Sequence, residues 1–376
     1  MTKKLLMIVN SPAFFMSHFY PIAEGAKAAG YDVHVASMVG EAVDSIKKAG
    51  IKHTVLPMSR SGKGVFEELR TFIAIWSLLW KVRPDVLHLM TIKPVLYGGI
   101  AARFAPVKGV LSVITGLGFV FLGKGFRAQL LRFFISKSYR VALSKRNLRV
   151  LFENPDDCQA LGSLGAFNEG QAELIRGAGV DLVEYAFLPE KTELPVVCLA
   201  ARLLRDKGVV EFVEAAHMLQ KRGVRARFQL IGDTDPGNPA TITAHEIRQW
   251  QLDGVVELLG YRADIPQLFS DANLVVLPSY REGLPKVLLE AAACGRAVVT
   301  TDVPGCRHAI ISDVTGLIVP VRNAERLAEA IETLLANSEL RYRMGSAGRK
   351  LAESDFAIDK IVQQYLTIYG KLEGAI

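Results

Sequence analysis

Short apolar segments alternate with longer amphipathic ones along most of the chain, a pattern typical of strands separated by helices. LLMIVN (5–10) has the composition of a buried strand, FYPIAEGAKAAG (19–30) has helical spacing, and YDVHVAS (31–37) predicts the next strand. Strands joined by helices form parallel sheets with helices on both faces, so the pattern predicts an α/β fold. The same alternation predicts further strands over HTVLPM (53–58), DVLHLM (85–90), GVLSVIT (109–115) and RVLFE (149–153).

A second series of alternating strands and helices follows the first. Between the two series lies LPEKTELP (188–195), whose prolines and charges favour a connection between domains. At 376 residues the chain is long for one domain, so we predict two doubly wound Rossmann-like domains that face each other across a cleft. The predicted domains are 1–187 and 188–355, and the amphipathic C-terminal helix 356–376 is expected to complete the first. The second domain's predicted strands are VVCLAA (196–201), ARFQLIG (226–232), VVELLG (255–260), NLVVLPS (273–279), RAVVTT (296–301) and GLIVP (316–320).

The net charge of +7 conceals an asymmetry along the chain. Residues 1–150 hold 22 Lys or Arg against 7 Asp or Glu, a net charge of +15, whereas the rest is acidic overall. A region so basic indicates either a solvated basic face or an anionic partner, which would be lipid headgroups, a diphosphate-bearing substrate or nucleic acid. The four cysteines show neither a CxxC motif nor metal spacing, which is typical of reduced thiols in a cytosolic protein. No apolar run has the composition expected of a membrane-spanning helix.

The most informative stretch is REGLPKVLLEAAACG (281–295), which follows a predicted buried strand. Pro285 suits the first turn of a helix, and the N–H groups near residues 283–286 would form an anion site at the helix N-terminus. Glu282 precedes this helix, and Glu290 lies inside it among leucines and alanines. Carboxylates repel phosphate but accept hydrogen bonds from hydroxyls. The arrangement therefore indicates sugar hydroxyls at Glu282, phosphate at the helix N-terminus and ribose hydroxyls at Glu290.

A second candidate motif, LAARLLRDKGV (199–209), follows the strand predicted to start at residue 196. Arg202 and Lys207 would lie at the carboxyl end of that strand, where ligands bind in open parallel sheets. An Arg fork and a Lys charge together suit a diphosphate. Asp206 is expected to cap the helix that follows.

Together these stretches resemble the retaining glycosyltransferases of family 4. Glu282 and Glu290, with ACGRAVVTTDVPG after them, resemble the family's nucleotide-sugar site, and ARLLRDKG resembles its diphosphate-binding Arg and Lys. IRGAGVD (175–181) and LFENPDD (151–157) resemble two further stretches of the family. The resemblance covers nearly the whole chain, most specifically 196–320. It implies the GT-B fold, transfer without a metal ion or other cofactor, and retention of anomeric configuration.

By that resemblance, the second domain binds a UDP-sugar, and the catalytic residues are Glu282, Arg202 and Lys207. Glu282 contacts the donor sugar, while Arg202 and Lys207 stabilise the leaving diphosphate. Glu290 holds the ribose. The other implied donor-binding residues are Gly283, Leu284 and Pro285 at the helix start, and Tyr261 and Arg262 near the base. Gly116 is a further candidate from the sequence itself, since the glycines of its TGLG stretch would let backbone approach the donor closely.

Four stretches carry a closer resemblance: GDTDPGNPATI (232–242), GYRADI (260–265), SYREGLPKVLLEAAACG (279–295) and DVPGCRHAI (302–310). This closer resemblance is to bacterial transferases that extend sugars on undecaprenyl diphosphate. It implies a polyprenyl-diphosphate-linked glycan as acceptor, and a cytoplasmic enzyme held peripherally on the anionic inner face of the plasma membrane. Such partners would account for the basic first domain. Two stretches that mix apolar and basic residues, 119–149 and 65–81, suit either a bilayer surface or core helices. The candidate acceptor-binding residues are His18, Ser17 and Lys93, and His88 also lies near a predicted strand end.

The chain departs from many relatives at ITGLGFVF, where Thr115 and Gly116 stand in place of a histidine. A mechanism in which the leaving phosphate takes the acceptor proton needs no protein base and would fit this departure. Other functions stay open: transfer to a soluble acceptor, a UDP-sugar 2-epimerase of the same architecture, and a non-catalytic binder of sugar nucleotides or nucleic acid. The basic first domain and the EGLP motif argue against the epimerase. The phosphate-binding residues and paired glutamates exceed what a passive binder needs, so we expect no nucleic-acid partner.

Overall fold

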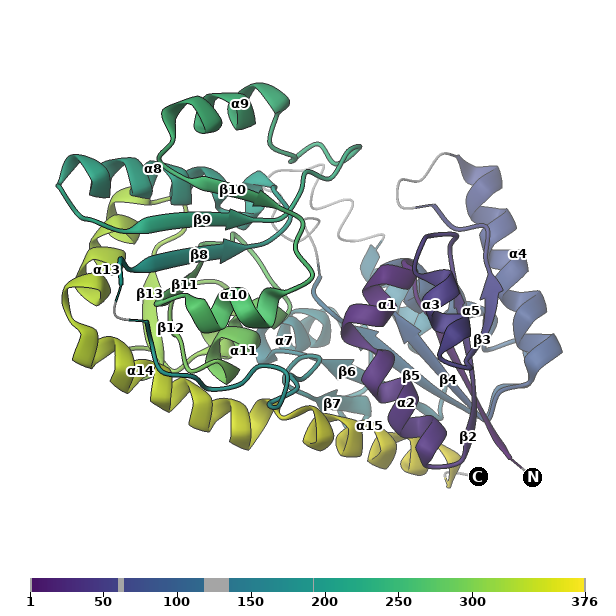
Figure 1. The fold of residues 1–376 in the computed structure, drawn as a ribbon. Coiled ribbons are helices and arrows are strands. Elements are labelled where there is room, and N and C mark those ends of the chain that lie inside the picture. The colour runs from purple at the N-terminus through teal and green to yellow at the C-terminus, as the bar shows by residue number, and fades with distance from the viewer. Residues whose placement is uncertain (1, 60–63, 118–134, 192, 375–376) are drawn as a thin grey trace. The chain divides into compact units, whose positions relative to one another are not determined.

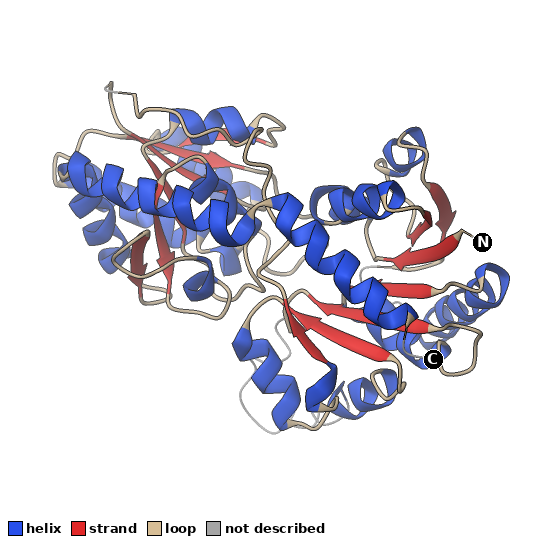
Figure 2. Cartoon of the chain, turned by 90° about the horizontal axis from the view of Figure 1, so that it is seen from below, coloured by secondary structure: helices blue, strands red, loops and turns tan. Residues whose placement is uncertain are grey.

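The computed structural model describes residues 2–59, 64–117, 135–191 and 193–374. The chain divides into two compact units, Met1–Ala178 with Asp359–Ile376, and Gly179–Ile358. Each unit is a sheet of strands with helices packed against it (Figure 1; Figure 2). The expected class of two doubly wound, Rossmann-like α/β domains is confirmed.

The first unit is built on a seven-stranded sheet of order β3-β2-β1-β4-β5-β6-β7, in which neighbouring strands are parallel. Strands β4 and β5 are buried along their whole length, which is why they read as continuous apolar runs in the sequence. The strands are β1 (Lys3–Ile8), β2 (Tyr31–Ser37), β3 (Lys52–Val55), β4 (Val86–Met90), β5 (Gly109–Ile114), β6 (Leu148–Phe152) and β7 (Ala172–Leu174). The helices of this unit include α1 (Pro12–His18), α2 (Tyr20–Ala28), α3 (Val43–Lys48), α4 (Val65–Val82), α5 (Ile92–Ala101) and α7 (Pro155–Ser163).

The second unit has a six-stranded parallel sheet of order β10-β9-β8-β11-β12-β13. Apolar side chains form a core on each face of this sheet. Its strands are β8 (Val196–Ala200), β9 (Arg227–Ile231), β10 (Glu257–Gly260), β11 (Leu274–Leu277), β12 (Ala297–Thr301) and β13 (Gly316–Val319). Its helices are α8 (Val209–Lys221), α9 (Ala244–Asp253), α10 (Ile265–Asp271), α11 (Lys286–Ala293), α12 (Cys306–Ala309), α13 (Ala324–Ala336) and α14 (Ser338–Leu351).

The C-terminal helix α15 (Ile358–Glu373) packs on the first unit although it follows the second unit in the chain. Tyr365 and Tyr369 are buried on this helix. The hydroxyl of Tyr369 lies 2.8 Å from Nδ1 of His88 in β4. Asn147 Nδ2 donates to the carbonyl oxygen of Leu372 at 2.6 Å. The helix therefore supplies part of the first unit's core.

The division between the units lies at Ala178/Gly179, before the boundary at 187/188 that the sequence suggested. The N–H of Val180 donates to the carbonyl oxygen of Phe356 at 2.8 Å. Tyr185 is buried in the apolar core of the second unit. The residues just before 188 are thus packed into the second unit. The prolines and charges of 188–195 predicted a connection but did not show that the residues before it belong to the second unit.

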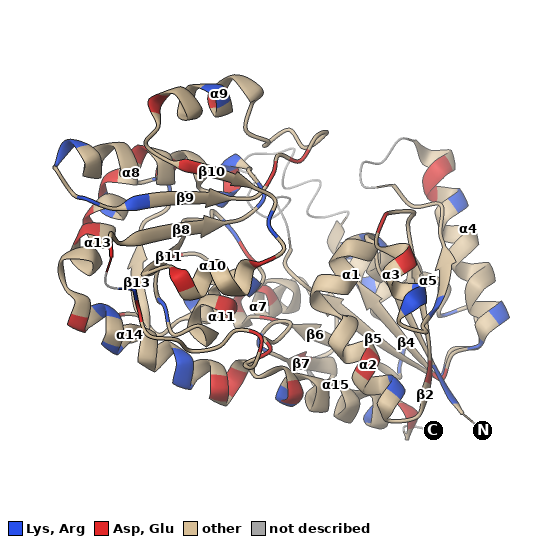
Figure 3. Ribbon diagram, in the orientation of Figure 1, with Lys and Arg blue, Asp and Glu red and all other residues tan. Residues whose placement is uncertain are grey.

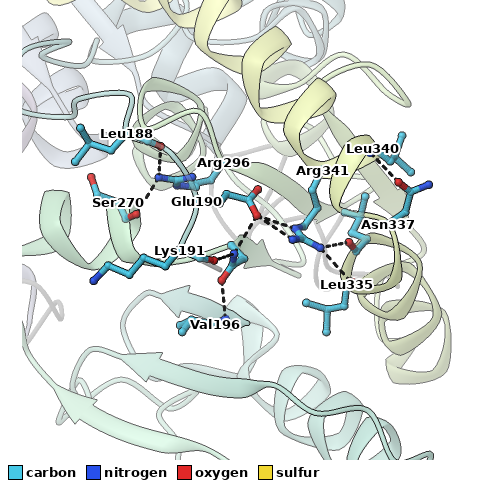
Figure 4. Close-up of polar contacts among 12 residues, drawn as sticks. Leu188, Glu190, Lys191, Val196, Ser270, Arg296, Leu335, Asn337, Leu340 and Arg341 are labelled. Atoms are coloured by element: carbon cyan, nitrogen blue, oxygen red, sulfur yellow. Dashed lines mark hydrogen bonds and ion pairs between the residues drawn. The ribbon is translucent and has the colours of Figure 1, made fainter. Parts of the chain in front are cut away.

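A polar network fastens the stretch around residue 190 to the second unit (Figure 4). Glu190 Oε2 accepts hydrogen bonds from Arg341 Nη2 and from Asn273 Nδ2, each at 2.9 Å. Arg296 Nη2 donates to the carbonyl oxygen of Leu188 at 2.7 Å. Both arginines are buried. Buried charges are stable only when they are paired and hydrogen-bonded, so these contacts hold the connecting stretch against the second sheet.

Candidate active site

The two candidate motifs meet because β8 and β11 are neighbours in the second sheet, which brings their carboxyl ends together. Lys207 ends a short 3-10 turn after β8, and Glu282 lies in the loop after β11. Lys207 Nζ is 2.5 Å from Glu282 Oε1, and both side chains are largely buried. The cation expected at the diphosphate and the carboxylate expected at the sugar therefore form one ion pair.

The loop that carries Glu282 is fixed by its surroundings. Ser279 Oγ donates to Glu282 Oε1 at 2.6 Å. Gly305, in the loop after β12, has a φ of +84°, and a Cβ there would lie 2.5 Å from the carbonyl oxygen of Gly283. Only glycine permits both this backbone conformation and this close approach. Backbone packing thus holds the Glu282 loop in place before any ligand arrives.

Helix α11 begins at Lys286, so Pro285 is the residue that precedes the first turn instead of part of it. The helix ends as the sequence predicted, because Cys294 caps it and Gly295 follows with a φ of +66°. The first N–H groups of an α-helix have no acceptor within the helix, and its N-terminus carries a partial positive charge. The start of α11 therefore adds an anion-favouring group beside Glu282.

Glu290, on α11, lines a pocket and is only 8% exposed. The Tyr185 hydroxyl donates to Glu290 Oε1 at 2.8 Å, and Lys286 Nζ lies 3.2 Å from the same oxygen. Burial and the Glu290 charge raise the pKa of Tyr185, so its phenol stays protonated and acts as a donor. The carboxylate in this apolar helix is thus compensated by two donors at the edge of a pocket.

The pocket has a volume of about 310 Å³ and is lined by residues of the second unit. This is within the range of small-molecule sites. Gly232 forms part of its wall with a φ of +135°, and a Cβ there would lie 1.9 Å from the carbonyl oxygen of Ala201. The pocket also contains four residues expected to bind the donor: Arg202, Tyr261, Arg262 and Glu290.

Arg202 is paired with an acidic residue that the sequence reasoning missed. Arg202 Nη1 is 2.5 Å from Asp235 Oδ2, and the backbone N–H of Asp235 donates to Thr241 Oγ1 at 3.0 Å. Asp233 and Thr234 line the pocket wall beside them. The available signal was DTDPG (233–237), which directly follows the predicted strand 226–232, where a doubly wound sheet binds ligands.

The structure corrects the expected role of Asp206 and adds detail on Tyr261 and Arg262. Asp206 does not cap α8: Gly208 takes that position, and no side chain caps the helix. The carbonyl oxygen of Asp206 accepts the N–H of Tyr280 at 2.8 Å, which ties the two motif loops together. Tyr261 is an exposed residue of the pocket rim, and Arg262 Nε donates to Asp264 Oδ1 at 2.7 Å.

The residues predicted in the first unit lie near the ends of its elements. Ser17 Oγ is 2.7 Å from His18 Nδ1 at the end of α1, and the His18 ring stacks on Phe14 with 4.2 Å between ring centres. Gly116 follows β5 with a φ of +120°. These contacts orient His18, and its role and that of Gly116 stay predictions.

Lys93 and His88 are engaged within the first unit. Lys93 Nζ donates to Glu68 Oε1 at 2.7 Å and to the carbonyl oxygen of Ser59 at 2.9 Å, so an α4 carboxylate already compensates its charge. His88 is the middle residue of β4 and is fully buried against α15. Burial lowers its pKa to about 3, so His88 is a neutral core residue.

Over the ranges that the structure describes, no group of three or more His, Cys, Asp or Glu side chains is placed to hold a metal ion. None of the helices in those ranges is both long and apolar enough to cross a membrane. The sequence left either a bilayer surface or a core helix open for 119–149, and residues 119–134 of that stretch lie outside the described ranges.

Comparison with known proteins identifies the family. Residues 184–351 match the model of the glycosyl transferases group 1, and residues 4–153 match a glycosyl transferase 4-like model. The N,N'-diacetylbacillosaminyl-diphospho-undecaprenol alpha-1,3-N-acetylgalactosaminyltransferase of Campylobacter jejuni is 32% identical over 372 residues, which cover 94% of this chain and 95% of that relative. The chain belongs to the group 1 glycosyltransferases. Both candidate motifs of this glycosyltransferase, 202–207 and 282–290, lie inside the region that the group 1 model matches.

Solved structures share the fold of this glycosyltransferase. Sucrose-phosphate synthase from Thermosynechococcus elongatus matches with a TM-score of 0.81 and 22% identity over 100% of both chains. Anabaena HepE in complex with UDP-glucose matches with a TM-score of 0.77 and 19% identity over 98% of this chain and 99% of that one. At such identities the likeness establishes the GT-B fold and nothing finer. Family membership also favours a transferase over the 2-epimerase that shares this architecture.

Proposed function

We propose that this glycosyltransferase moves a hexose or N-acetylhexosamine from a UDP-sugar to an undecaprenyl-diphosphate-linked saccharide, with retention of anomeric configuration and without a metal ion. One observation carries the proposal: the Lys207–Glu282 pair lies at the same edge of the second sheet as a pocket that contains Arg202 and Glu290. Cations suited to a diphosphate and carboxylates suited to hydroxyls are thereby gathered at one place.

Each part of the donor has a matching group. The pocket accepts the nucleoside, with Glu290 as acceptor for ribose hydroxyls and Tyr261 at the rim for the base. Arg202 and Lys207 bind the diphosphate, since a guanidinium fork and a compact ammonium complement its oxygens. Glu282 accepts hydrogen bonds from hydroxyls of the transferred sugar.

In the proposed reaction, the bond between the anomeric carbon and the diphosphate oxygen breaks, and UDP leaves with the bonding electron pair. The acceptor hydroxyl oxygen bonds to the anomeric carbon on the same face, and its proton passes to the leaving phosphate oxygen. The main electrostatic demand is the charge that develops on that phosphate. Lys207, Arg202 and the N-terminus of α11 meet this demand, and Thr115 and Gly116 fit a route that uses no protein base.

The acceptor class rests on the relative and on charge. The Campylobacter jejuni enzyme is named for a diphospho-undecaprenol-linked acceptor and an alpha-1,3 linkage, and an alpha product from an alpha-linked nucleotide sugar means retention. The first 150 residues carry a net charge of +15, which suits a diphosphate on an anionic bilayer. We therefore place the enzyme peripherally on the inner face of the plasma membrane, in surface-glycan or protein-glycan assembly, with His18 and Ser17 as acceptor contacts.

The test is a transfer assay with polyprenyl-diphosphate-linked saccharides and a panel of UDP-, GDP- and ADP-sugars, with and without EDTA. We expect transfer from a UDP-sugar that EDTA leaves unchanged, and NMR of the product should show the donor's anomeric configuration. Lys207→Ala and Glu282→Ala should each lower kcat/KM by about 100- to 1000-fold. Arg227→Ala is the control, because Arg227 on β9 pairs with Glu257 on β10 at the surface, and neither residue lines the pocket.

The outcomes separate the parts of the proposal. Transfer from a GDP- or ADP-sugar alone would overturn the donor, and an inverted product would overturn the mechanism. Transfer only to free saccharides would replace the lipid-linked acceptor by a soluble one. Full activity of Lys207→Ala would show that the Lys207–Glu282 ion pair is not needed for catalysis.

A further inference from the structure

Helix α4 carries an apolar stripe on the face that points away from the first unit's core. The stripe consists of Phe66, Leu69, Ile73, Trp76 and Trp80, whose side chains are 40–89% exposed. They are separated by three, four, three and four residues, which places them along one side of an α-helix. The opposite side of α4 is buried through Thr71, Ile75, Leu78 and Leu79.

A neighbouring loop extends this apolar stripe. Phe104 follows α5 and is 63% exposed. Trp76 Nε1 donates to the carbonyl oxygen of Phe104 at 3.2 Å, so the two aromatic residues lie at one surface. The guanidinium carbon of Arg103 is 5.9 Å from the centre of the Phe104 ring. An exposed apolar surface with two tryptophans, two phenylalanines and adjacent arginine marks an interaction site.

The charges around the stripe are basic. From Leu69 to Val82, α4 contains Arg70 and Lys81 and no acidic residue, and Arg83 follows directly (Figure 3). These three cations are exposed. Both acidic residues of α4 lie in its first turn, and one of them, Glu68, is paired with Lys93 at 2.7 Å. Basic residues therefore flank the stripe at Arg70 and at its C-terminal end, and exposed Glu67 lies beside its first residue.

We propose that the α4 stripe is the surface by which this glycosyltransferase docks on an anionic bilayer, with the helix lying parallel to the membrane plane. Tryptophan and phenylalanine insert at the level of the headgroups, and Arg70, Lys81 and Arg83 contact anionic lipid. A protein partner would need acidic groups around a matching groove, whereas a lipid surface supplies apolar depth and negative charge together. The inference rests on the proposed lipid-linked acceptor and names the surface that brings the enzyme to it.

The chain contains its own probe for this contact. Trp76 and Trp80 are two of its three tryptophans, and the third, Trp250, is buried in the second unit. Vesicles of phosphatidylcholine and phosphatidylglycerol should shift the fluorescence to shorter wavelength, and brominated lipids should quench it. Replacing both stripe tryptophans by phenylalanine should abolish the response while vesicle binding is retained.

Cosedimentation with these vesicles tests the surface directly. Phe66→Ser and Trp80→Ser should each lower the partition coefficient by about tenfold or more, since each removes a large side chain from the lipid. Arg70→Gln should weaken binding by about fivefold on anionic vesicles and leave binding to pure phosphatidylcholine unchanged. Leu252→Ser is the matched control, because Leu252 is 82% exposed on α9 and outside the stripe.

Membrane docking through α4 and glycosyl transfer can be tested independently of each other. Phe66→Ser should keep its transfer rate on an acceptor with a short, water-soluble prenyl chain and lose rate only on acceptor embedded in vesicles. If Phe66→Ser and Trp80→Ser bind vesicles as tightly as the wild-type protein, the inference is overturned. It is also overturned if the wild-type protein does not bind vesicles. A stripe variant that changes the oligomeric state without changing lipid binding would assign the stripe to a second copy instead. Vesicle binding through α4 without any glycosyl transfer would contradict the proposed function alone.

Discussion

Replacing Glu190 by alanine is expected to destabilise the second unit strongly, because it leaves the buried guanidinium of Arg341 without its carboxylate. Glu190 Oε2 accepts from Arg341 Nε at 3.1 Å and from Nη2 at 2.9 Å. Arg341 Nη1 keeps the carbonyl oxygens of Leu334 and Leu335, at 2.7 and 3.0 Å. Removing one partner of a buried ion pair costs about 3–5 kcal/mol, and the two retained bonds place this case near 3 kcal/mol. For a domain of this size that lowers the melting temperature by about 6–12 °C.

The neighbouring residue provides the control. Lys191 Nζ pairs with Asp271 at 2.6 Å on the surface, so Lys191→Ala should cost only about 0–1 kcal/mol. Its carbonyl group, which accepts from Asn273, is unchanged by that substitution. Differential scanning calorimetry of the full chain is the measurement, and the shift should fall on the transition that UDP stabilises.

A second substitution tests the cause. In Glu190→Ala with Arg341→Met, no buried charge is left without a partner, so part of the lost stability should return. If Glu190→Ala melts within about 2 °C of Lys191→Ala, or if the double variant melts below Glu190→Ala, the reasoning from an unpaired buried guanidinium is refuted.

Further predictions concern the donor site and the first core. Tyr185→Phe removes the phenol that donates to Glu290 and should weaken UDP binding about 3- to 10-fold in calorimetric titration. Gly305→Ala places a methyl group against the Glu282 loop and should lower both kcat/KM and the melting temperature. Because the pKa of His88 is lowered to about 3 from 6.5, the unfolded chain binds more protons there than the folded one. Above pH 6.5 His88 does not lower the free energy of unfolding. Between pH 6.5 and pH 3 it lowers the free energy of unfolding by about 1.4 kcal/mol for each unit by which the pH falls. Melting curves of His88→Gln should show a flatter decline over that interval.

Each of these has a matched comparison. Tyr342→Phe alters an exposed tyrosine of α14 and should leave UDP binding unchanged, and an equal loss in both variants would contradict the role of the Tyr185 phenol. Gly237 also has a positive φ, of +88°, but a Cβ there meets nothing within 4 Å. If Gly237→Ala impairs the enzyme as much as Gly305→Ala, backbone strain and not the clash explains the effect. An unchanged pH slope in His88→Gln, with exposed His245→Gln as reference, would exclude the buried histidine as its source.

The sequence was informative about the second unit because its candidate residues follow buried strands directly. Once β8 and β11 are neighbours, Arg202, Lys207 and Glu282 are brought to one edge of the sheet by strand order alone. Glu290, which the sequence places among leucines and alanines, is only 8% exposed in the structure. The direct contact of Lys207 with Glu282, 75 residues apart, depends on side-chain geometry that a linear pattern does not contain.

The first unit shows what such patterns miss. VLHLM reads as a strand whether its histidine meets a ligand or a distant helix, and His88 meets Tyr369, 281 residues away. Lys93 pairs with Glu68 of α4, a contact that its position after a predicted strand does not reveal, and its role at the acceptor stays a prediction. Helix α4 is apolar on both its buried and its outward face, and periodicity alone therefore left open whether 65–81 was core or surface.

The Lys207–Glu282 pair bears on turnover in the proposed reaction. Without the donor, the charges of Lys207 and Glu282 compensate each other. A free phosphate ion can therefore bind Lys207 only by breaking its ion pair with Glu282. An intact nucleotide sugar satisfies both, because its diphosphate takes the ammonium while its hydroxyls take the carboxylate. After transfer, the departing UDP carries no sugar to occupy Glu282, and the carboxylate competes with the diphosphate to recover Lys207. If the proposed reaction holds, the contact that discourages binding of incomplete ligands also promotes release of the product.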